Sequence, residues 1–174
     1  ALMETIGSGA VTNVFADVAR ADVALVTGSN TTANHPVAAT FIKQAAKAGT
    51  DLIVVDVRRN AIADVARHFA QIRPGTDVAF YNALLHVLCR DGLLDRDYIA
   101  THTEGFDELE ALVTADYSPD QSAAVCGVSA EQIEAIAHTI GRATPSGGGG
   151  SMIVFWGMGI SQHVTGTDNA RCLI

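Results

Sequence analysis

Short apolar runs alternate with longer amphipathic stretches along this chain. The runs at residues 23–26, 52–55, 69–72 and 152–155 are bounded by glycine or polar residues, which predicts four buried strands. Amphipathic stretches at 10–21, from about 34 to 48, at 60–65 and at 78–90 predict helices. Pro36 suits the first turn of the second helix and Gly49 its C-terminal stop. The apolar positions that we expect on the inner faces of the first two helices are Val11, Val14, Phe15, Val18, Val37, Phe41, Ile42 and Ala45.

A helical interval separates the third and fourth predicted strands. Residues 92–142 carry helical periodicity, marked by Leu109, Leu112 and Val113 in one helix and by a Ser-x-x-Gln start at Ser129 in another. Residues 144–151 have the composition of a flexible linker. Their Gly-Gly-Gly-Gly-Ser run is also a common engineered insert, so it supports no functional inference.

Strands that alternate with helices predict βαβ units and a parallel sheet. We therefore expect an α/β fold, a Rossmann-like three-layer domain with a mostly parallel sheet and a helical insertion at about 92–142, and one domain over residues 1–174. Right-handed crossovers place the carboxyl ends of all parallel strands at one edge. The loops at 27–35, 56–59, 73–77 and 157–168 should gather there, at what we call the rim, where open α/β sheets bind ligands.

Composition and charge exclude several classes of protein. The net charge of -8 gives no basic footprint for nucleic acid, and the apolar stretches are too short to span a membrane. Cys89, Cys126 and Cys172 are widely spaced and form no CxxC or Cys/His cluster, which argues against a disulfide framework or structural zinc. We expect a reducing, cytoplasmic setting and a chain cut from a longer protein.

Two rim loops carry glycines that would let a backbone approach a ligand. Gly28-Ser29-Asn30 follows the first strand, and Trp156-Gly157-Met158-Gly159 follows the last, with a helix start near Thr167 and Asp168. Neither loop reads G-x-G-x-x-G. The first continues Gly28-Ser29-Asn30 and lacks the second glycine, and the last has Gln162 where a third glycine would be. No P-loop motif is present. An ordinary NAD-binding domain is therefore disfavoured. His163, inside the last loop, is a candidate ligand contact.

Charged side chains at the rim have two interpretations each. Asp56 could accept hydrogen bonds from a ribose or a base, or serve as a turn aspartate. Arg58, which we prefer to Arg59, could bind a phosphate. Asp77 is expected to cap the helix that follows it, and could also read the N1–H and N2–H of guanine. His35 is expected to cap or orient the helix that begins at Pro36.

An ordered set of motifs resembles a known family. The set is Gly28-Ser29-Asn30-x-x-x-x-His35-Pro36, Asp56-x-Arg58-Arg59, Arg73-Pro74-Gly75-Thr76-Asp77, Thr103-Glu104-Gly105-Phe106 and Trp156-Gly157-Met158-Gly159-x-x-Gln162-His163-x-x-Gly166-Thr167-Asp168-Asn169. It resembles molybdopterin oxidoreductases of the dimethyl-sulfoxide-reductase superfamily. The particular residues of these motifs resemble those of the catalytic α subunit of molybdenum- or tungsten-dependent formate dehydrogenase. The resemblance implies oxidation of formate to carbon dioxide, with electrons passed toward NAD.

The resemblance also implies a ligand and its contacts. This segment would bind the guanosine diphosphate arm of one molybdopterin guanine dinucleotide, whose metal is molybdenum or tungsten. Asp56 and Arg58 would bind ribose and guanine, and Asp77 would read guanine. The implied cofactor-binding residues are Gly28, Asn30, Asn34, His35, Asp56, Arg58, Gly75, Asp77, Met158, Gly159, Gln162 and His163. Position 57 departs from the family pattern, since Val57 stands where proline is usual, and a somewhat looser turn is expected there.

The rest of the catalytic machinery is expected outside this chain. The resemblance implies that the metal ligand and the iron–sulfur clusters lie in other parts of the subunit, and that electron-transfer subunits with iron–sulfur or flavin groups are partners. We therefore expect the 174-residue chain to have no activity by itself. Two alternatives remain from the sequence: the middle domain of a thiamine-diphosphate enzyme, and an excised or engineered α/β scaffold without activity.

Overall fold

A four-stranded, all-parallel sheet organises the computed structural model, which describes residues 2–174. The strands are β1 (Val23–Thr27), β2 (Asp51–Asp56), β3 (His68–Gln71) and β4 (Met152–Trp156), in the spatial order β3-β2-β1-β4. β1 pairs in register with β2 on one side and with β4 on the other, so that Thr27 lies between Val55 and Trp156. All four predicted strands are confirmed, and the strand order reverses direction between β1 and β4.

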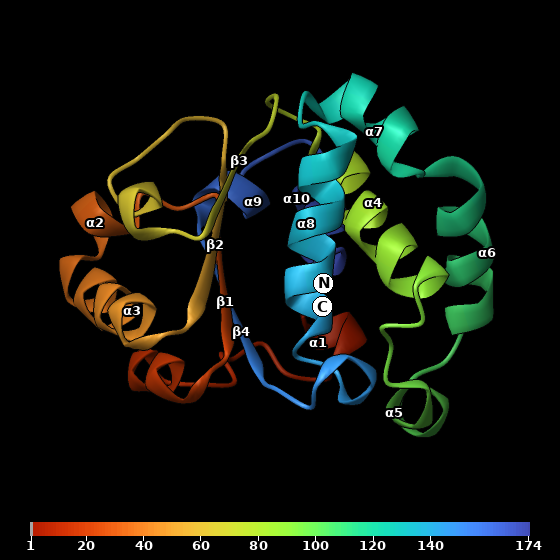
Figure 1. The fold of residues 1–174 in the computed structure, drawn as a ribbon, viewed down its shortest axis with the longest axis horizontal. Coiled ribbons are helices and arrows are strands. Elements are labelled where there is room, and N and C mark those ends of the chain that lie inside the picture. Colours follow the sequence, from red (N-terminus) through yellow and green to blue (C-terminus); the bar gives the residue numbers. More distant parts are fainter. Residues whose placement is uncertain (1) are drawn as a thin grey trace.

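Helices cover both faces of the sheet, which confirms the predicted α/β fold with three layers (Figure 1). On one face, α3 (Pro36–Ala48) and the 3-10 helix η1 (Phe15–Arg20) pack over an aliphatic core that includes Val26, Ile42 and Leu52. Short apolar side chains predominate there, so the helix backbone lies close to the sheet. The one-turn helix α2 (Thr31–Asn34) and the 3-10 turn η2 (Ala63–Val65) complete this layer.

The larger core lies on the opposite face. It is covered by α4 (Asp77–Arg90), α7 (Pro119–Cys126), α8 (Ala130–Gly141) and α10 (Gly166–Arg171). Phe80, Ile133 and Ile136 are fully buried in it. α5 (Arg96–His102) and α6 (Phe106–Asp116) add a small core around Val113 at the far side of α4. The predicted helical interval therefore supplies part of the layer that covers the sheet.

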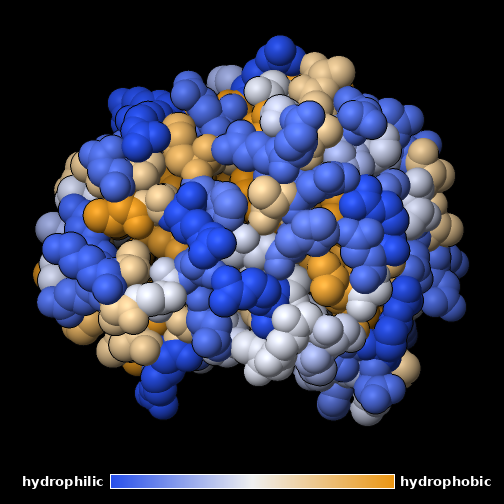
Figure 2. Space-filling model, viewed as in Figure 1, coloured by the Kyte–Doolittle hydropathy of each residue, from blue (hydrophilic) through white to orange (hydrophobic). Residues whose placement is uncertain are grey.

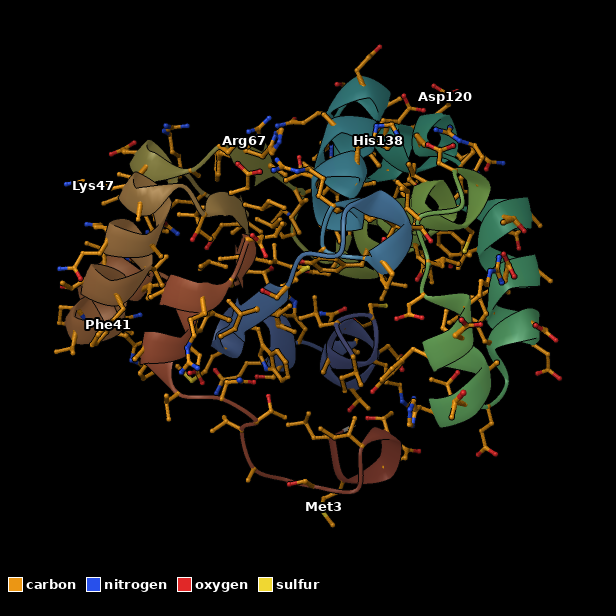
Figure 3. All side chains as sticks on the ribbon, turned by 60° about the horizontal axis from the view of Figure 1, so that its bottom comes forward. Met3, Phe41, Lys47, Arg67, Asp120 and His138 are labelled. Atoms are coloured by element: carbon orange, nitrogen blue, oxygen red, sulfur yellow. The ribbon has the colours of Figure 1, made fainter. Side chains whose placement is uncertain are left out.

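Several helix predictions were wrong in detail. Residues 10–14 are not helical, and only η1 forms in the first predicted helix, where Val11 is 89% exposed. On α3 the buried positions are Ala38, Ala39, Ile42 and Ala45, whereas Val37 is 71% exposed and Phe41 lies on the outer side (Figure 3). Small residues face the sheet because β1 and β2 already present branched side chains there. On α6 only Val113 is buried, and Leu109 and Leu112 are exposed.

The predicted helix at 60–65 and the predicted start of α8 also differ from the structure. Only η2 forms within residues 60–65. The Ser129 hydroxyl accepts the Gln132 amide as expected of a capping residue, but the Gln132 side chain instead donates to the Phe69 carbonyl at 2.7 Å. This bond fixes α8 against β3. The long-range contact thus replaces the local one that the capping-box motif predicts.

The predicted linker forms a compact connection between α8 and β4. Its residues include the 3-10 turn η3 (Pro145–Gly147), whose Gly147 amide donates to the Thr144 carbonyl at 3.0 Å. A Cβ on Gly147 would lie 2.0 Å from the Gly141 carbonyl oxygen, so the chain passes close to the end of α8. The predicted flexibility of this segment stays a prediction.

Figure 2 shows hydrophilic side chains across the viewed surface, interrupted by small hydrophobic areas.

A half-buried histidine joins β3 to α8. The Thr139 hydroxyl donates to the Ala135 carbonyl, so the Nε2–H of His68 is the donor in its 2.9 Å bond to Thr139 Oγ1. Burial, together with the positive charge of Arg67, lowers the pKa of His68, while Asp51 opposes the shift. The folded chain therefore favours the neutral imidazole.

His68 should make the chain less stable in acid. Because its pKa is lowered by folding, its contribution is present at neutral pH and is lost as the pH falls below the ordinary value of about 6.5. We expect the free energy of unfolding to fall less between about pH 7 and about pH 5 in His68→Gln than in the wild type. Denaturant unfolding at several pH values measures this difference, and parallel curves for the two proteins would contradict it.

Candidate functional site

The four predicted rim loops meet at the carboxyl ends of the strands. They surround a cavity of about 260 Å³, which we call the inner cavity. Its lining comes from all four loops: Gly28, Asn30, Asp56, Val57, Arg58, Ile72, Pro74, Asp77, Gly159 and His163. The cavity lies beside the point where the strand order reverses, which is where open α/β sheets bind ligands. The predicted convergence of the loops is confirmed.

Glycines join the two loops that follow β1 and β4. A Cβ on Gly28 would lie 2.7 Å from the carbonyl carbon of Gly159, and a Cβ on Gly157 would lie 2.6 Å from the Gly28 carbonyl oxygen. The Gly159 amide donates to that same oxygen at 3.0 Å. The sequence pattern predicts that these glycines let the protein backbone approach a ligand closely. In the structure they allow the two loops to touch, and this contact forms part of the wall of the inner cavity.

A buried asparagine anchors the loop after β4. This loop contains the one-turn helix α9 (Met158–Ser161), which the sequence did not predict, and then leads into α10. Asn169 is 1% exposed, and its Nδ2 donates to the Ile160 carbonyl at 3.1 Å. It thereby fixes the end of α9 and the position of Gly159 in the inner cavity. This role of Asn169 does not follow from the sequence pattern, although Asn169 belongs to the motif that resembles the family.

Asp77 is a buried carboxylate at the inner cavity. It is 4% exposed, and no ion pair to it is present within residues 2–174. Burial raises the pKa of Asp77. Its own backbone N–H and the imidazole of His163 partly offset this rise, and the negative charge of Asp56 adds to it. The capping prediction was wrong by one position, since Thr76 is the residue before α4 and its hydroxyl donates to the Arg73 carbonyl at 2.7 Å. Asp77 is therefore in the first turn of α4, where the helix dipole favours an anion.

Asp56 is held by two donors. Its Oδ1 accepts the backbone N–H of Arg58 at 3.1 Å, and its Oδ2 accepts Nδ2 of Asn60 at 3.2 Å. The turn at Val57 is closed further by Gln71, whose Nε2 donates to the Val57 carbonyl at 3.1 Å. Asn60 was not among the residues predicted for this site. Its signal was an asparagine just before a short helical turn, a usual place for side-chain bonds to backbone.

A second hollow lies on the other side of Arg58. This outer hollow has a volume of about 360 Å³ and is lined by Asn30, Thr32, Ala33, Arg58, Arg59, Asn60 and Ala61. It shares Asn30 and Arg58 with the inner cavity. The Thr32 hydroxyl oxygen is buried and has no hydrogen-bond partner in the described chain. A buried hydroxyl without a partner is costly, and one beside a hollow is suited to a bound polar group.

The two rim arginines differ in what they contact. Arg59 pairs with Asp64 at 3.2 Å, and its guanidinium lies 5.2 Å from the centroid of the Phe69 ring. Arg58 is exposed and lines both hollows. No side-chain hydrogen bond or ion pair of Arg58 is found in residues 2–174. Of the two, Arg58 is the one free to bind an anion, as the sequence analysis preferred.

Five of the predicted binding residues lie outside both hollows. They are Asn34, His35, Gly75, Met158 and Gln162, all exposed. His35 precedes α3 without a side-chain capping bond, so the predicted capping role was wrong, while its place at the helix start was right. Gly75 has a φ of 79° and open space around it. Binding by these five stays a prediction.

Metal and membrane features are absent from the part of the chain that the structure covers. Residues 2–174 bring together no group of three or more His, Cys, Asp or Glu side chains that could hold a metal ion. None of the helices within that range combines the length and apolarity that a membrane crossing requires. Cys89 and Cys126 are buried, and Cys172 is half-buried.

The family of this chain follows from its match to a known protein-family profile. The profile described as "Molybdopterin oxidoreductase" matches residues 3–174, almost the whole chain. The chain belongs to the molybdopterin oxidoreductase family. This membership confirms the resemblance found in the sequence and sets aside the thiamine-diphosphate alternative.

Relatives of this molybdopterin oxidoreductase chain include enzymes of more than one activity. It is 36% identical over 167 residues to the F420-dependent formate dehydrogenase subunit alpha of Methanocaldococcus jannaschii, with 96% of this chain and 24% of the relative covered. It is 31% identical over 172 residues to formate dehydrogenase H of Escherichia coli, with 99% and 23% covered. A nitrate reductase of Symbiobacterium thermophilum is 35% identical over 161 residues, with 87% and 21% covered. The chain thus spans about a quarter of the length of these relatives.

A solved structure supports the same assignment of the fold. Acetylene hydratase from Pelobacter acetylenicus matches with a TM-score of 0.70 and 26% sequence identity, covering 84% of this chain and 21% of that one. The α/β architecture of this molybdopterin oxidoreductase chain is thus shared with a member of another activity. Fold and family therefore leave the reaction to be argued from the site.

Proposed function

We propose that the rim binds the guanosine diphosphate arm of a molybdopterin guanine dinucleotide. The observation that carries the proposal is Asp77, a carboxylate 4% exposed that has no cation partner in the described chain and lines the inner cavity. A buried charge of this kind is costly unless a bound group supplies donors to it. Guanine presents two parallel donors, N1–H and N2–H, which match the two oxygens of one carboxylate.

The remaining polar groups suit the rest of the arm. Asp56 lies in the same cavity and would accept hydrogen bonds from ribose hydroxyls. Arg58, without a partner of its own, lies between the two hollows and would bind the diphosphate. Asn30 and the partnerless hydroxyl of Thr32 would donate to neighbouring oxygens. Donors and acceptors at the rim thus fit a guanine nucleotide, which supports the cofactor implied by the family.

The proposed activity of the whole protein is oxidation of formate to carbon dioxide. When bound, the cofactor's molybdenum or tungsten would supply two-electron chemistry, and the residues of this chain would hold its nucleotide arm and orient it. Support comes from formate dehydrogenases at 36% and 31% identity among the relatives. Nitrate reduction is the second candidate, because a nitrate reductase is 35% identical. Assays of the full-length protein with formate and with nitrate distinguish the two.

The partners and the electron acceptor belong to the same proposal. The metal ligand and iron–sulfur clusters would be on the remaining domains of a cytoplasmic catalytic subunit, and electrons would pass through iron–sulfur or flavin subunits toward NAD. The relative from Methanocaldococcus jannaschii is named for F420 instead. Supplying each acceptor in turn to the full-length protein with formate therefore tests this part separately.

Calorimetry with GDP tests the proposed site directly. The wild-type chain should bind GDP, and should bind ADP at least about tenfold more weakly, because adenine lacks the N1–H and N2–H donors that Asp77 would accept. Equal binding of the two nucleotides would leave a phosphate site without guanine recognition. No binding of either nucleotide would remove the proposal.

The two rim arginines offer a matched pair for the phosphate contact. Arg58→Ala should weaken GDP binding about tenfold and leave guanosine binding unchanged, since a charged contact to the diphosphate is lost. Arg59→Ala should change neither by more than about twofold, because Arg59 is paired with Asp64. The difference between the arginines should shrink at higher salt. Equal losses of guanosine and GDP in Arg58→Ala would instead indicate a contact with the base or ribose.

A further inference from the structure

Asn60 joins the loop after β1 to the loop after β2. Its Nδ2 donates to Oδ2 of Asp56 at 3.2 Å and lies 3.4 Å from the Ser29 carbonyl oxygen, which it also donates to. Its Oδ1 accepts the backbone N–H of Ile62 at 3.3 Å, and its carbonyl accepts the amide of Ala63 at 3.0 Å. One half-buried side chain thus contacts both loops and the turn that follows.

These contacts fix the two groups that shape the proposed nucleotide site. Asp56 has two carboxylate oxygens, and Asn60 is the side-chain donor to one of them while the Arg58 amide occupies the other. Ser29 immediately precedes Asn30, which lines both hollows. The Asn60 amide therefore contributes both to the orientation of Asp56, together with the Arg58 amide, and to the distance between the two loops.

We propose that Asn60 is a positioning residue of this nucleotide site, holding Asp56 in the orientation that accepts the ribose and holding the β1 loop at the distance that the diphosphate requires. The inference rests on the proposed function. Only an amide donates twice from one end while accepting at the other. Aspartate would keep the shape and the acceptor but lose both donated bonds, and a hydroxyl is too short to reach all three partners.

The pH dependence of Asn60→Asp separates positioning from general stability. At about pH 7.5 the variant places two carboxylates against each other, and GDP binding should be about tenfold weaker than in the wild type. At about pH 5 the pair shares one proton, which restores the bond to Asp56 but not the bond to the Ser29 carbonyl. The ratio of variant to wild-type affinity should therefore rise toward one without reaching it. The charged groups that face this pair are Asp77 and His163 across the inner cavity, Arg58 on its own loop, and Arg59 with Asp64 beyond. These groups are present in both proteins, so their own effect on GDP affinity cancels in the ratio of variant to wild type.

Asn13→Asp is a matched control. Asn13 is exposed, and its Nδ2 donates to Oδ2 of Asp17 at 3.3 Å, an Asn–carboxylate pair like that of Asn60 but away from the rim. It should change GDP binding by less than about twofold at either pH. A ratio for Asn60→Asp that stays constant with pH, or wild-type affinity at both pH values, would overturn the positioning role.

Amide hydrogen exchange tests the inference without any nucleotide. If Asn60 orients Asp56, the Arg58 amide should exchange at least about tenfold faster in Asn60→Ala than in the wild type, while an amide of β1 such as that of Leu25 changes little. Unchanged protection at Arg58 would overturn the inference. If the wild type fails to bind GDP but Arg58 loses protection, the proposed nucleotide is wrong and the role of Asn60 in joining the loops stands.

Discussion

Asp77→Asn is expected to weaken GDP binding about tenfold to a hundredfold, because an amide can accept only one of the two guanine donors and meets the other with its own N–H. The same substitution should raise the stability of the nucleotide-free chain at neutral pH. Asp77 is 4% exposed, has no ion-pair partner in residues 2–174 and has a raised pKa, so its charge is costly in the folded state. Asparagine keeps the shape of the side chain and removes that cost.

The pH dependence of stability follows from the raised pKa of Asp77. Folding raises this pKa, so between the ordinary value of about 4 and the higher folded value the native chain binds more protons than the unfolded chain. Stability from this group is therefore present in acid and is lost as the pH rises through that interval. We expect Asp77→Asn to be more stable than the wild type at about pH 7, and expect the difference to vanish below about pH 4.

Binding calorimetry and denaturant unfolding measure these two effects. Asp120→Asn is a suitable control, since Asp120 is exposed near the start of α7, lines neither hollow, and its loss changes the net charge by the same amount (Figure 3). It should alter neither GDP affinity nor the pH profile. Unchanged GDP affinity in Asp77→Asn would remove guanine recognition by this residue from the proposed function.

Gly28→Ala should destabilise the chain by about 2–4 kcal/mol, because strain in the backbone and overlap with the neighbouring loop add together. Gly28 has a φ of 55°, and its added Cβ would lie 2.7 Å from both the Gly159 carbonyl carbon and the Ile160 nitrogen. Both of these are backbone atoms of the loop that contains α9. They cannot move aside without breaking the bond from the Gly159 amide to the Gly28 carbonyl.

Gly92→Ala separates the two contributions. Gly92 has a φ of 68° but no heavy atom within 4 Å of an added Cβ, so its substitution should cost only about 1 kcal/mol of backbone strain. The difference between the two variants in free energy of unfolding then measures the contact between the loops. Equal losses in Gly28→Ala and Gly92→Ala would show that this contact contributes nothing to stability.

The strands and their order of succession could be predicted because each rests on a local pattern. Four apolar runs were long enough to be buried strands, and each is a strand in the structure. Parallel pairing followed from the alternation with helices, and the convergence of the rim loops followed from the handedness of the crossovers. Asp56, Arg58 and Asp77 were correctly placed at one cavity for that reason.

The details of helix burial could not be predicted from periodicity alone. Val37 and Phe41 follow helical spacing as well as Ile42 does, but the sheet offers room only for the alanines and Ile42 of α3. Val11 and Val14 have the spacing of a helix and no element to pack against among residues 2–174. A single hydrophobic face is recognised only when its partner surface is known.

The α/β class, the four strands, the rim and the family follow from the residue patterns alone, because each pattern is local or depends only on the order of motifs along the chain. The role of each rim residue follows instead from the folded arrangement of the loops. The glycines of two loops allow those loops to contact each other, and Arg59 is paired while Arg58 is not. Asp77 is buried without an ion-pair partner, and Asn60 lies between Asp56 and Ser29. These roles depend on distances between loops far apart in the chain, and packing of the whole sheet and its helices sets those distances.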